Sequence, residues 1–266
     1  MDRAAAELFL DHYRLSPQSP AMAGLEQVAG AFSRLPWENL TKYLLRAQDS
    51  RESCTLRMPL RVFEEHISLG AGGTCFSLTM ALESVLKRLG YSCRPVMADM
   101  SHGPDIHCAL LVRLSKGTAL MDPGYLLPVP VMLHSQRAVQ TTVAGQTFRY
   151  TPDGGNGWHL HTIRDGDVRW RYRLKGDPIT TDAFLHHWRR SFRSTGMNSL
   201  HLSRLTDSGR LYAHNANLRV IERQTGRNLK LGSDYAREIE ARFGLDRRLA
   251  GRAWRELRRA RERRCE

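Results

Sequence analysis

The chain has 266 residues, of which 41% are hydrophobic, enough for a substantial core in one large domain or in two to three packed subdomains. The 40 lysines and arginines outnumber the 27 aspartates and glutamates, so the formal net charge is +13. No uninterrupted apolar run approaches the roughly 18 residues of a membrane-spanning helix. The N-terminus also lacks the basic start and apolar core of a signal peptide, so we expect a cytoplasmic protein with no membrane partner.

The cysteines are odd in number and irregularly spaced, with no CxxC pair. They are Cys54, Cys75, Cys93, Cys108 and Cys265. This pattern is not a disulfide framework and is typical of a reducing compartment. It also argues against a structural zinc site, which takes four closely spaced ligands. We therefore expect no metal centre.

The first 90 residues are predicted to be helical. Apolar residues recur at three- and four-residue spacing in 3–15 and 21–34. A third helix is expected over 58–69, with Pro59 near its first turn and Gly70 at its end. A fourth is expected from Cys75 to Leu89, and it stops at Gly90.

The middle of the chain is predicted to form an antiparallel sheet or barrel. Short apolar runs broken by turn signals occupy 91–100, 106–114 and 118–124, and further strands are expected within 136–150 and 167–173. A helix is then expected at 181–193. Three short strands follow within 199–223, and a helix with Ser233 as its N-cap covers 233–245.

Cys75 begins its predicted helix directly after the glycine cluster of GAGGTCF. The free N–H groups of a first helical turn lower the pKa of a thiol and can stabilise an oxyanion. Small glycines before the helix let backbone approach closely. Two interpretations remain open on this stretch alone: a nucleophile, or a small buried apolar residue.

His107 and Asp122 are the candidate base and orienting carboxylate. His107 opens the strand IHCALLV, and Asp122 follows it by 15 residues, at the end of the next strand. If the two strands pair around Lys116-Gly117, their ends meet and the two side chains lie close together. His102, in the preceding loop, is the competing base. A packed strand histidine and an Asp-Pro-Gly turn are the alternatives without catalysis.

Short motifs in the same order resemble the arylamine N-acetyltransferases, and the chain is identified as a divergent member of that family. They are LPWENL at 35–40, GGTCF at 72–76, IHCALLV at 106–112 and MDPGY at 121–125. The resemblance runs from about residue 5 to 245. It implies a Cys75–His107–Asp122 triad arranged as in cysteine proteases.

The resemblance implies an α+β fold in three parts. These are a helical bundle with the nucleophile at 1–90, a β-barrel with the histidine and aspartate at 91–190, and an α/β lid at 191–245. Residues 246–266 hold nine arginines. They are expected to form an arginine-rich helix or tail beyond the resemblance.

The family's reaction is ping-pong acyl transfer. In this chain Cys75 would attack a thioester, His107 would move protons, and Asp122 would hold the imidazole tautomer. The donor would be acyl-CoA or another phosphopantetheine thioester, used as a substrate, with no permanently bound cofactor. Gly124, Tyr125 and Ile106 would line the donor site. The acceptor would be a small-molecule amine, hydrazine or hydroxylamine.

Several positions depart from the family pattern. Ala71 replaces an arginine before the two glycines, and Ser77 replaces a glutamate after the nucleophile. Glu38 remains, so a charged network has lost two members and is either rebuilt or altered for another acceptor. Leu126 replaces a glycine, and Ile106 replaces a frequent threonine. These changes favour a specialised amide synthase of natural-product assembly, with an acidic acyl-carrier protein as donor, which the +13 charge would attract.

The alternatives come from other functional classes. The same order of cysteine, histidine and aspartate occurs in thiol hydrolases of the transglutaminase or papain type. A non-catalytic basic protein that binds nucleic acid is also compatible with the charge, with Trp188 and Trp254 for stacking. No helix-turn-helix, zinc-finger or RNA-recognition signature is evident, so nucleic acid is not an expected partner. A family member without turnover is the remaining alternative.

Overall fold

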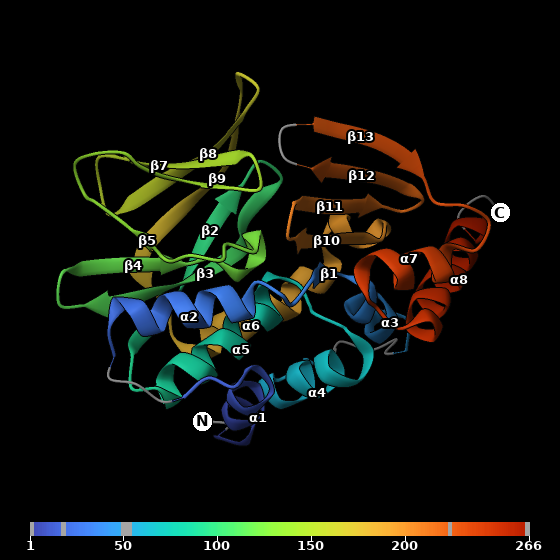
Figure 1. Cartoon of the computed structure of the whole chain (residues 1–266), viewed down its shortest axis with the longest axis horizontal. Helices are drawn as coiled ribbons and strands as arrows, with labels where there is room; N and C mark the ends of the chain where they lie inside the picture. Colours follow the sequence, from blue (N-terminus) through green and yellow to red (C-terminus); the bar gives the residue numbers. More distant parts are fainter. Residues whose placement is uncertain (1–2, 17–19, 49–54, 223–224, 264–266) are drawn as a thin grey trace.

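The computed structural model describes residues 3–16, 20–48, 55–222 and 225–263 (Figure 1). Blue and teal helices lie along one side of the molecule, beneath the green and yellow barrel strands. A second, orange sheet stands beside the barrel, with the C-terminal helices against it. Each of these groups corresponds to a continuous part of the chain except for β1 (Trp37–Glu38), which joins the orange sheet from the N-terminal part.

The N-terminal part is helical, as its apolar spacing predicts. Its helices are α1 (Arg3–Tyr13), α2 (Met22–Phe32), α3 (Leu40–Gln48), α4 (Pro59–Leu69) and α5 (Cys75–Arg88). Pro59 occupies the first turn of α4, and Gly70 ends it in the left-handed conformation that favours glycine. Helix α3 was not predicted, because polar residues interrupt the apolar residues in its short sequence, LTKYLLRAQ.

An aromatic cluster joins these helices. The ring of Phe9 on α1 lies 5.5 Å from Phe32 on α2 and 5.1 Å from Phe63 on α4. All three side chains are buried in a core that extends to α5 and to the neighbouring strands. This packing fixes α5, whose first residue is Cys75.

The middle of the chain forms an antiparallel sheet that is nearly closed into a barrel. In spatial order the strands are β5 (Val131–Met132), β4 (Gly117–Met121), β3 (Gly103–Leu114), β2 (Ser92–Met100), β9 (Asp167–Pro178), β8 (Gly157–Arg164), β7 (Gln146–Pro152) and β6 (Val139–Val143). The end strands β5 and β6 lie against each other without pairing. Strand β8 was not predicted from the sequence.

The hairpin of β3 and β4 has the pairing expected from the sequence. Leu110 lies opposite Met121, and Leu114 lies opposite Gly117. Asp122 therefore leaves the hairpin beside the strand segment that holds His107. The short helix η1 (Pro123–Tyr125) follows at once, and the Asp122 side chain caps it by accepting from the Tyr125 N–H.

The C-terminal sheet has the order β1, β10 (His201–Thr206), β11 (Gly209–His214), β12 (Asn217–Glu222), β13 (Thr225–Lys230). Helices α7 (Tyr235–Phe243) and α8 (Arg247–Glu262) share a core with it. The predicted N-cap of α7 was wrong, because Asp234, not Ser233, accepts from the Arg237 N–H at 3.1 Å. The arginine-rich segment is helical as far as Glu262, and 264–266 lie outside the described residues.

None of the helices in the described ranges combines the length and the apolar character needed to cross a membrane. The mixture of a helical part, a nearly closed antiparallel barrel and a smaller sheet with helices gives the α+β class expected from the sequence. The boundaries at residues 90, 190 and 245 remain predictions, since β1 crosses from the first part into the last.

Candidate active site

Cys75 lies buried at the first position of α5, with Thr74 as N-cap. Its Sγ is 3.9 Å from the carbonyl oxygen of Ile106 on β3. A side chain at Gly72 would place its Cβ 1.6 Å from the carbonyl oxygen of Pro36. The turn before Cys75 therefore requires glycine, because it packs directly onto another backbone.

His107 and Asp122 are brought together as the hairpin register requires. His107 Nε2 lies 3.1 Å from Asp122 Oδ2, and both side chains are buried. His102, the competing base, is exposed at the turn between β2 and β3. The structure thus favours His107 over His102 as the group that can act on Cys75.

Asp122 has further partners that fill its remaining acceptor sites. The hydroxyl of Tyr172 on β9 donates to Oδ2 at 2.6 Å, and the Tyr125 N–H donates to Oδ1 at 3.2 Å. The Tyr172 ring also stacks on His107, with ring centroids 4.8 Å apart. Tyr172 was missed because it lies 50 residues from Asp122 on a strand whose pairing the sequence does not reveal.

The side chains of Cys75, His107 and Asp122 converge around Gly124. A Cβ added there would lie 2.6 Å from His107 Cε1, 3.0 Å from Cys75 Cβ and 3.3 Å from Asp122 Oδ1. Gly124 was predicted to line the donor site, and the structure brings it to all three residues. Because glycine has no Cβ, these three side chains can approach one another at this point.

The other two predicted donor-site residues, Tyr125 and Ile106, lie next to His107 and Cys75, respectively. Tyr125 is half-buried, with its ring edge-on to His107 at 5.4 Å. Ile106 is half-buried and faces Cys75 through its carbonyl. The guanidinium of Arg210 on β11 donates to the Tyr125 carbonyl at 2.9 Å, which ties this segment to the C-terminal sheet.

The environment of Cys75 favours the thiolate. A hydrogen bond with the Cys108 thiol is the largest influence that lowers the pKa of Cys75 well below its ordinary value, with burial opposing it and His107 adding to it. Burial lowers the pKa of His107, but Asp122 and Cys75 outweigh burial and raise it to about 10. Both shifts favour the charged pair, a Cys75 thiolate beside a His107 imidazolium.

Cys108 is the second buried sulfur of the site. Its pKa is raised well above the ordinary value by burial and by Cys75. Its thiol donates to the Thr79 hydroxyl at 3.5 Å. Cys93 is buried elsewhere, and burial raises its pKa to about 12. The remaining two, Cys54 and Cys265, lie outside the described residues. Of the sulfurs described, Cys75 alone has the environment of a nucleophile.

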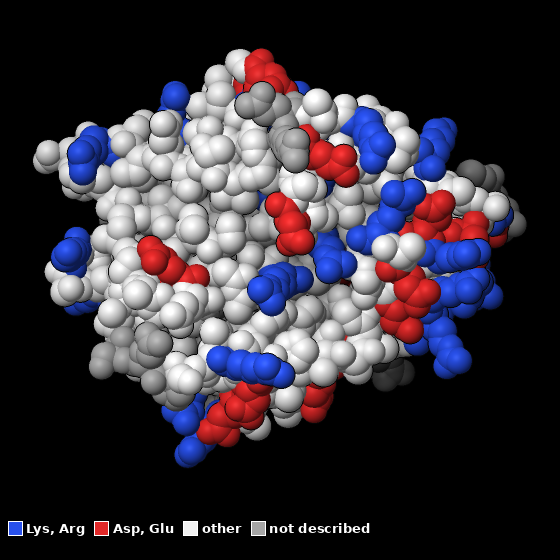
Figure 2. Space-filling model, in the orientation of Figure 1, with Lys and Arg blue, Asp and Glu red and all other residues white. Residues whose placement is uncertain are grey.

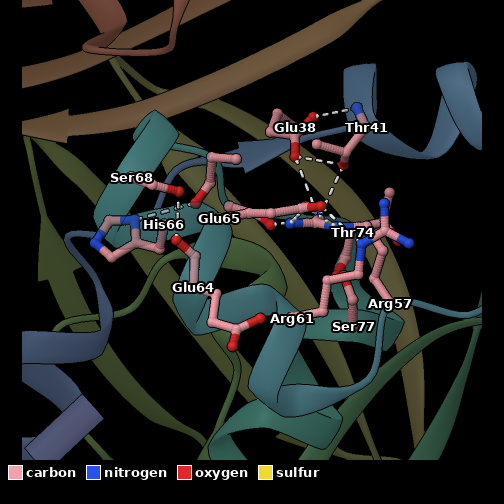
Figure 3. A network of polar contacts seen from close by, with 12 residues as sticks. Glu38, Thr41, Arg57, Arg61, Glu64, Glu65, His66, Ser68, Thr74 and Ser77 are labelled. Carbon is pink, nitrogen blue, oxygen red and sulfur yellow. Dashed lines mark hydrogen bonds and ion pairs between the residues drawn. The ribbon is translucent and has the colours of Figure 1, made fainter. Parts of the chain in front are cut away.

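The charged network around Glu38 is rebuilt instead of lost. Glu38 is fully buried and accepts from the Thr41 N–H at 2.9 Å and the Thr41 hydroxyl at 2.6 Å. Arg57 Nη1 lies 3.6 Å from its Oε1 (Figure 3). Ser77 bonds locally, donating to the Thr74 carbonyl at 3.1 Å. Sequence reasoning missed Arg57, which precedes α4 and has no motif around it.

Within the described ranges, no three His, Cys, Asp or Glu side chains are grouped so that they could hold a metal ion. The arrangement of Cys75, His107 and Asp122 needs none for covalent chemistry. A thiolate, a protonated imidazole and a carboxylate in contact are the groups of nucleophilic acyl transfer.

Solved structures share this fold. An arylamine N-acetyltransferase from Mycobacterium abscessus superposes with a TM-score of 0.78 at 16% identity, covering 95% of this chain and 94% of that one. One from Mycobacterium marinum in complex with CoA gives 0.75 at 20%, covering 94% and 98%. One from Bacillus cereus, described with a Cys-His-Glu catalytic triad, gives 0.71 at 16%, covering 92% and 99%.

No curated protein matches the sequence. The family model of the N-acetyltransferases, in contrast, matches residues 24–248. This range holds Cys75, His107 and Asp122 together with the barrel and the C-terminal sheet, and it ends just after α8 begins. The chain belongs to the N-acetyltransferase family.

Proposed function

We propose that this acyltransferase moves an acyl group from a thioester to an amine through a covalent intermediate on Cys75. The observation that supports the proposal best is the convergence of Cys75, His107 and Asp122 around Gly124. A thiolate at a helix N-terminus, beside an imidazole oriented by a carboxylate, has the parts of an acyl-transfer site.

In the first step the Cys75 thiolate attacks the thioester carbonyl. A carbon–sulfur bond forms to Cys75, the bond to the donor sulfur breaks, and the protonated His107 gives its proton to the departing thiolate. Because His107 Nε2 bonds to Asp122, Nδ1 is the ring nitrogen left to exchange the proton. N–H groups of the first turn of α5 can stabilise the oxyanion.

In the second step an amine attacks the acyl-Cys75 carbonyl. The neutral His107 takes the proton of the amine nitrogen as the amide forms, and Cys75 leaves as thiolate. Asp122, held by Tyr172 and by the Tyr125 N–H, keeps Nε2 as a donor throughout. Burial of the site limits the competing attack by water.

The donor is acyl-CoA or a phosphopantetheine thioester on an acidic carrier protein. The CoA complex of the Mycobacterium marinum enzyme supports the first. The arginines of α8 support the second, because most of this helix lies beyond the family match. A groove between α3 and α8 is lined by three of them, Arg252, Arg255 and Arg259, together with Glu256. Figure 2 shows Lys and Arg near the C-terminal helices, interspersed with Asp and Glu.

We place the reaction in the cytoplasm and in amide synthesis of specialised metabolism. The odd, irregular cysteines support a reducing compartment. The replacements at Ala71, Ser77 and Leu126 support an acceptor different from a simple arylamine. Leu126 follows Asp122 and Tyr125 in a left-handed conformation, with φ of 55°.

Incubation with a panel of acyl-CoAs and acyl-loaded carrier proteins tests the intermediate. Intact mass is expected to rise by one acyl group in the wild type, and Cys75→Ala is expected to gain none. Addition of an amine should release the label as an amide. Absence of an adduct from every donor would contradict the proposal, and release as free acid alone would indicate a thiol hydrolase.

The pH dependence of Cys75 alkylation tests the thiolate. An ordinary thiol, with a pKa of about 8.5, loses about tenfold in reactivity per pH unit below it. Because the pKa of Cys75 is lowered, the iodoacetamide rate should fall less steeply than this between pH 8 and pH 6, as checked by peptide mass. His107→Asn should make the pH dependence steeper than in the wild type, because His107 adds to the lowering of the Cys75 pKa. A steep rise already in the wild type would refute the thiolate.

A methyl group at position 124 tests the convergence of the site. Gly124→Ala should displace His107 or Cys75 and lower the acylation rate by about 100-fold, the effect of a misplacement near 1 Å. The matched control is Gly155→Ala in an exposed loop, where the added Cβ would lie 3.5 Å from Asp153 Oδ1, an ordinary contact. Rapid-quench acylation measures both. Equal rates for the two variants would contradict the arrangement.

Charge reversal on α8 separates the two donors. Arg252→Glu with Arg255→Glu should reduce transfer from an acyl-carrier protein by roughly tenfold and leave acyl-CoA unaffected, with the difference fading at high salt. Arg258→Glu with Arg261→Glu, on the same helix but away from the groove, is the matched control. Steady-state rates with each donor decide. If the rate of acyl transfer from the carrier protein changes neither with salt nor in either double variant, the carrier protein is excluded as a donor that binds to α8.

A further inference from the structure

Arg57 is a buried cation between elements that surround the turn before Cys75. Its side chain is 4% exposed. In Figure 3 it lies beneath Glu38 and Thr41, close to Thr74 and Ser77, with Glu65 on its other side. It comes from the segment that leads into α4, so it reaches α3, α4 and the turn before α5 at once.

The guanidinium holds these elements through separate hydrogen bonds. Nη1 donates to the Gly72 carbonyl at 2.7 Å and to the Thr41 hydroxyl at 2.9 Å. Nε donates to Glu65 Oε2 at 2.7 Å, and Nη2 lies 2.7 Å from the same oxygen. The planar guanidinium has several N–H groups at fixed angles, so it can bond to all three acceptors at once, whereas a single lysine ammonium cannot.

The backbone held by Arg57 is the one that leads to the nucleophile. Gly72 lies three residues before Cys75. On its other side the turn is bound to the N-terminal segment, because the Gly73 N–H donates to the Pro36 carbonyl at 3.3 Å and the Glu38 N–H donates to the Gly73 carbonyl at 3.0 Å. A Cβ at Gly73 would lie 3.3 Å from Arg57 Nη1, so guanidinium and turn are in close contact.

We propose that Arg57 is a positioning residue for Cys75. It acts through the Gly72 carbonyl, and it sets where the first turn of α5 begins and therefore where the sulfur and the free N–H groups stand relative to His107. Through Glu38, the same contact couples the nucleophile turn to the start of α3. The proposal rests on Cys75 being the nucleophile, as proposed above.

Arg61 supplies a matched control. It pairs with the same carboxylate, Glu65, at 2.7 Å through Oε1, yet its side chain is 45% exposed and points to Glu65, not to the turn before Cys75. Arg61→Gln therefore removes an arginine from Glu65 without altering the bond to Gly72. Arg57→Gln removes an arginine from Glu65 and also the guanidinium bond to the Gly72 carbonyl.

The test measures Cys75 alkylation by iodoacetamide in Arg57→Gln, Arg57→Lys and Arg61→Gln, each over a range of pH and below its measured Tm. Arg57→Gln is expected to react about 10- to 100-fold more slowly than the wild type, with a steeper rise with pH. Arg57→Lys, which keeps the charge but not the fork, should fall between. Arg61→Gln should match the wild type. Guanidinium ion should partly restore the rate of Arg57→Ala, which loss of stability alone would not predict.

Equal rates and pH profiles for Arg57→Gln and Arg61→Gln would overturn the proposal. If Arg57→Gln does not fold, Arg57→Lys decides, and an unchanged rate in that variant overturns it as well. Alkylation reports on the thiol and not on acyl transfer, so the two proposals can fail separately. A wild-type Cys75 that reacts normally while no acyl adduct forms would contradict the proposed function and leave the role of Arg57 standing.

Discussion

The carboxylate of Asp122 is shut off from water, and a buried charge must find its partners inside the protein. It finds three: the imidazole of His107, the hydroxyl of Tyr172 and the N–H of Tyr125. Each comes from a different element, so satisfying this one group fixes β3, β9 and η1 relative to one another. The raised pKa of His107 follows from that arrangement. His107 in turn adds to the influence of Cys108, which lowers the pKa of Cys75 most.

The nucleophile reaches this group from another part of the chain. Helix α5 packs in the helical core, and its first residue is set by a turn that has backbone on one side and the guanidinium of Arg57 on the other. The site thus joins two buried polar networks, one around Asp122 and one around Glu38. Loss of a partner in either would leave a charge without compensation, which is costlier than loss of a surface contact.

Local patterns of the sequence were sufficient for the elements that hold the chemistry. The glycine cluster before an amphipathic run placed Cys75 at a helix start, and alternating apolar runs around a turn placed His107 opposite Asp122. The resemblance to a family was needed for the lid and for the roles. Tyr172 could not be found this way, because its partner Asp122 lies 50 residues away. Arg57 could not be found either: its partners Glu65, Gly72 and Thr41 are 8, 15 and 16 residues away, but no periodicity or motif marks a single arginine.

Strand β1 has a consequence for the order in which the protein is completed. Its Trp37 and Glu38 pair with Ser203 and Leu202, and Trp37 also bridges to Gly73 beside the nucleophile. Asn39 adds a side-chain bond to the Ser199 carbonyl, 160 residues away. During synthesis, Cys75, His107 and Asp122 all leave the ribosome well before that sheet exists. The nucleophile turn packs against β1, and β1 gains its neighbour β10 only after His201–Thr206 have been made, about three quarters of the way along the chain. The site is therefore completed late, although its reactive groups are made early.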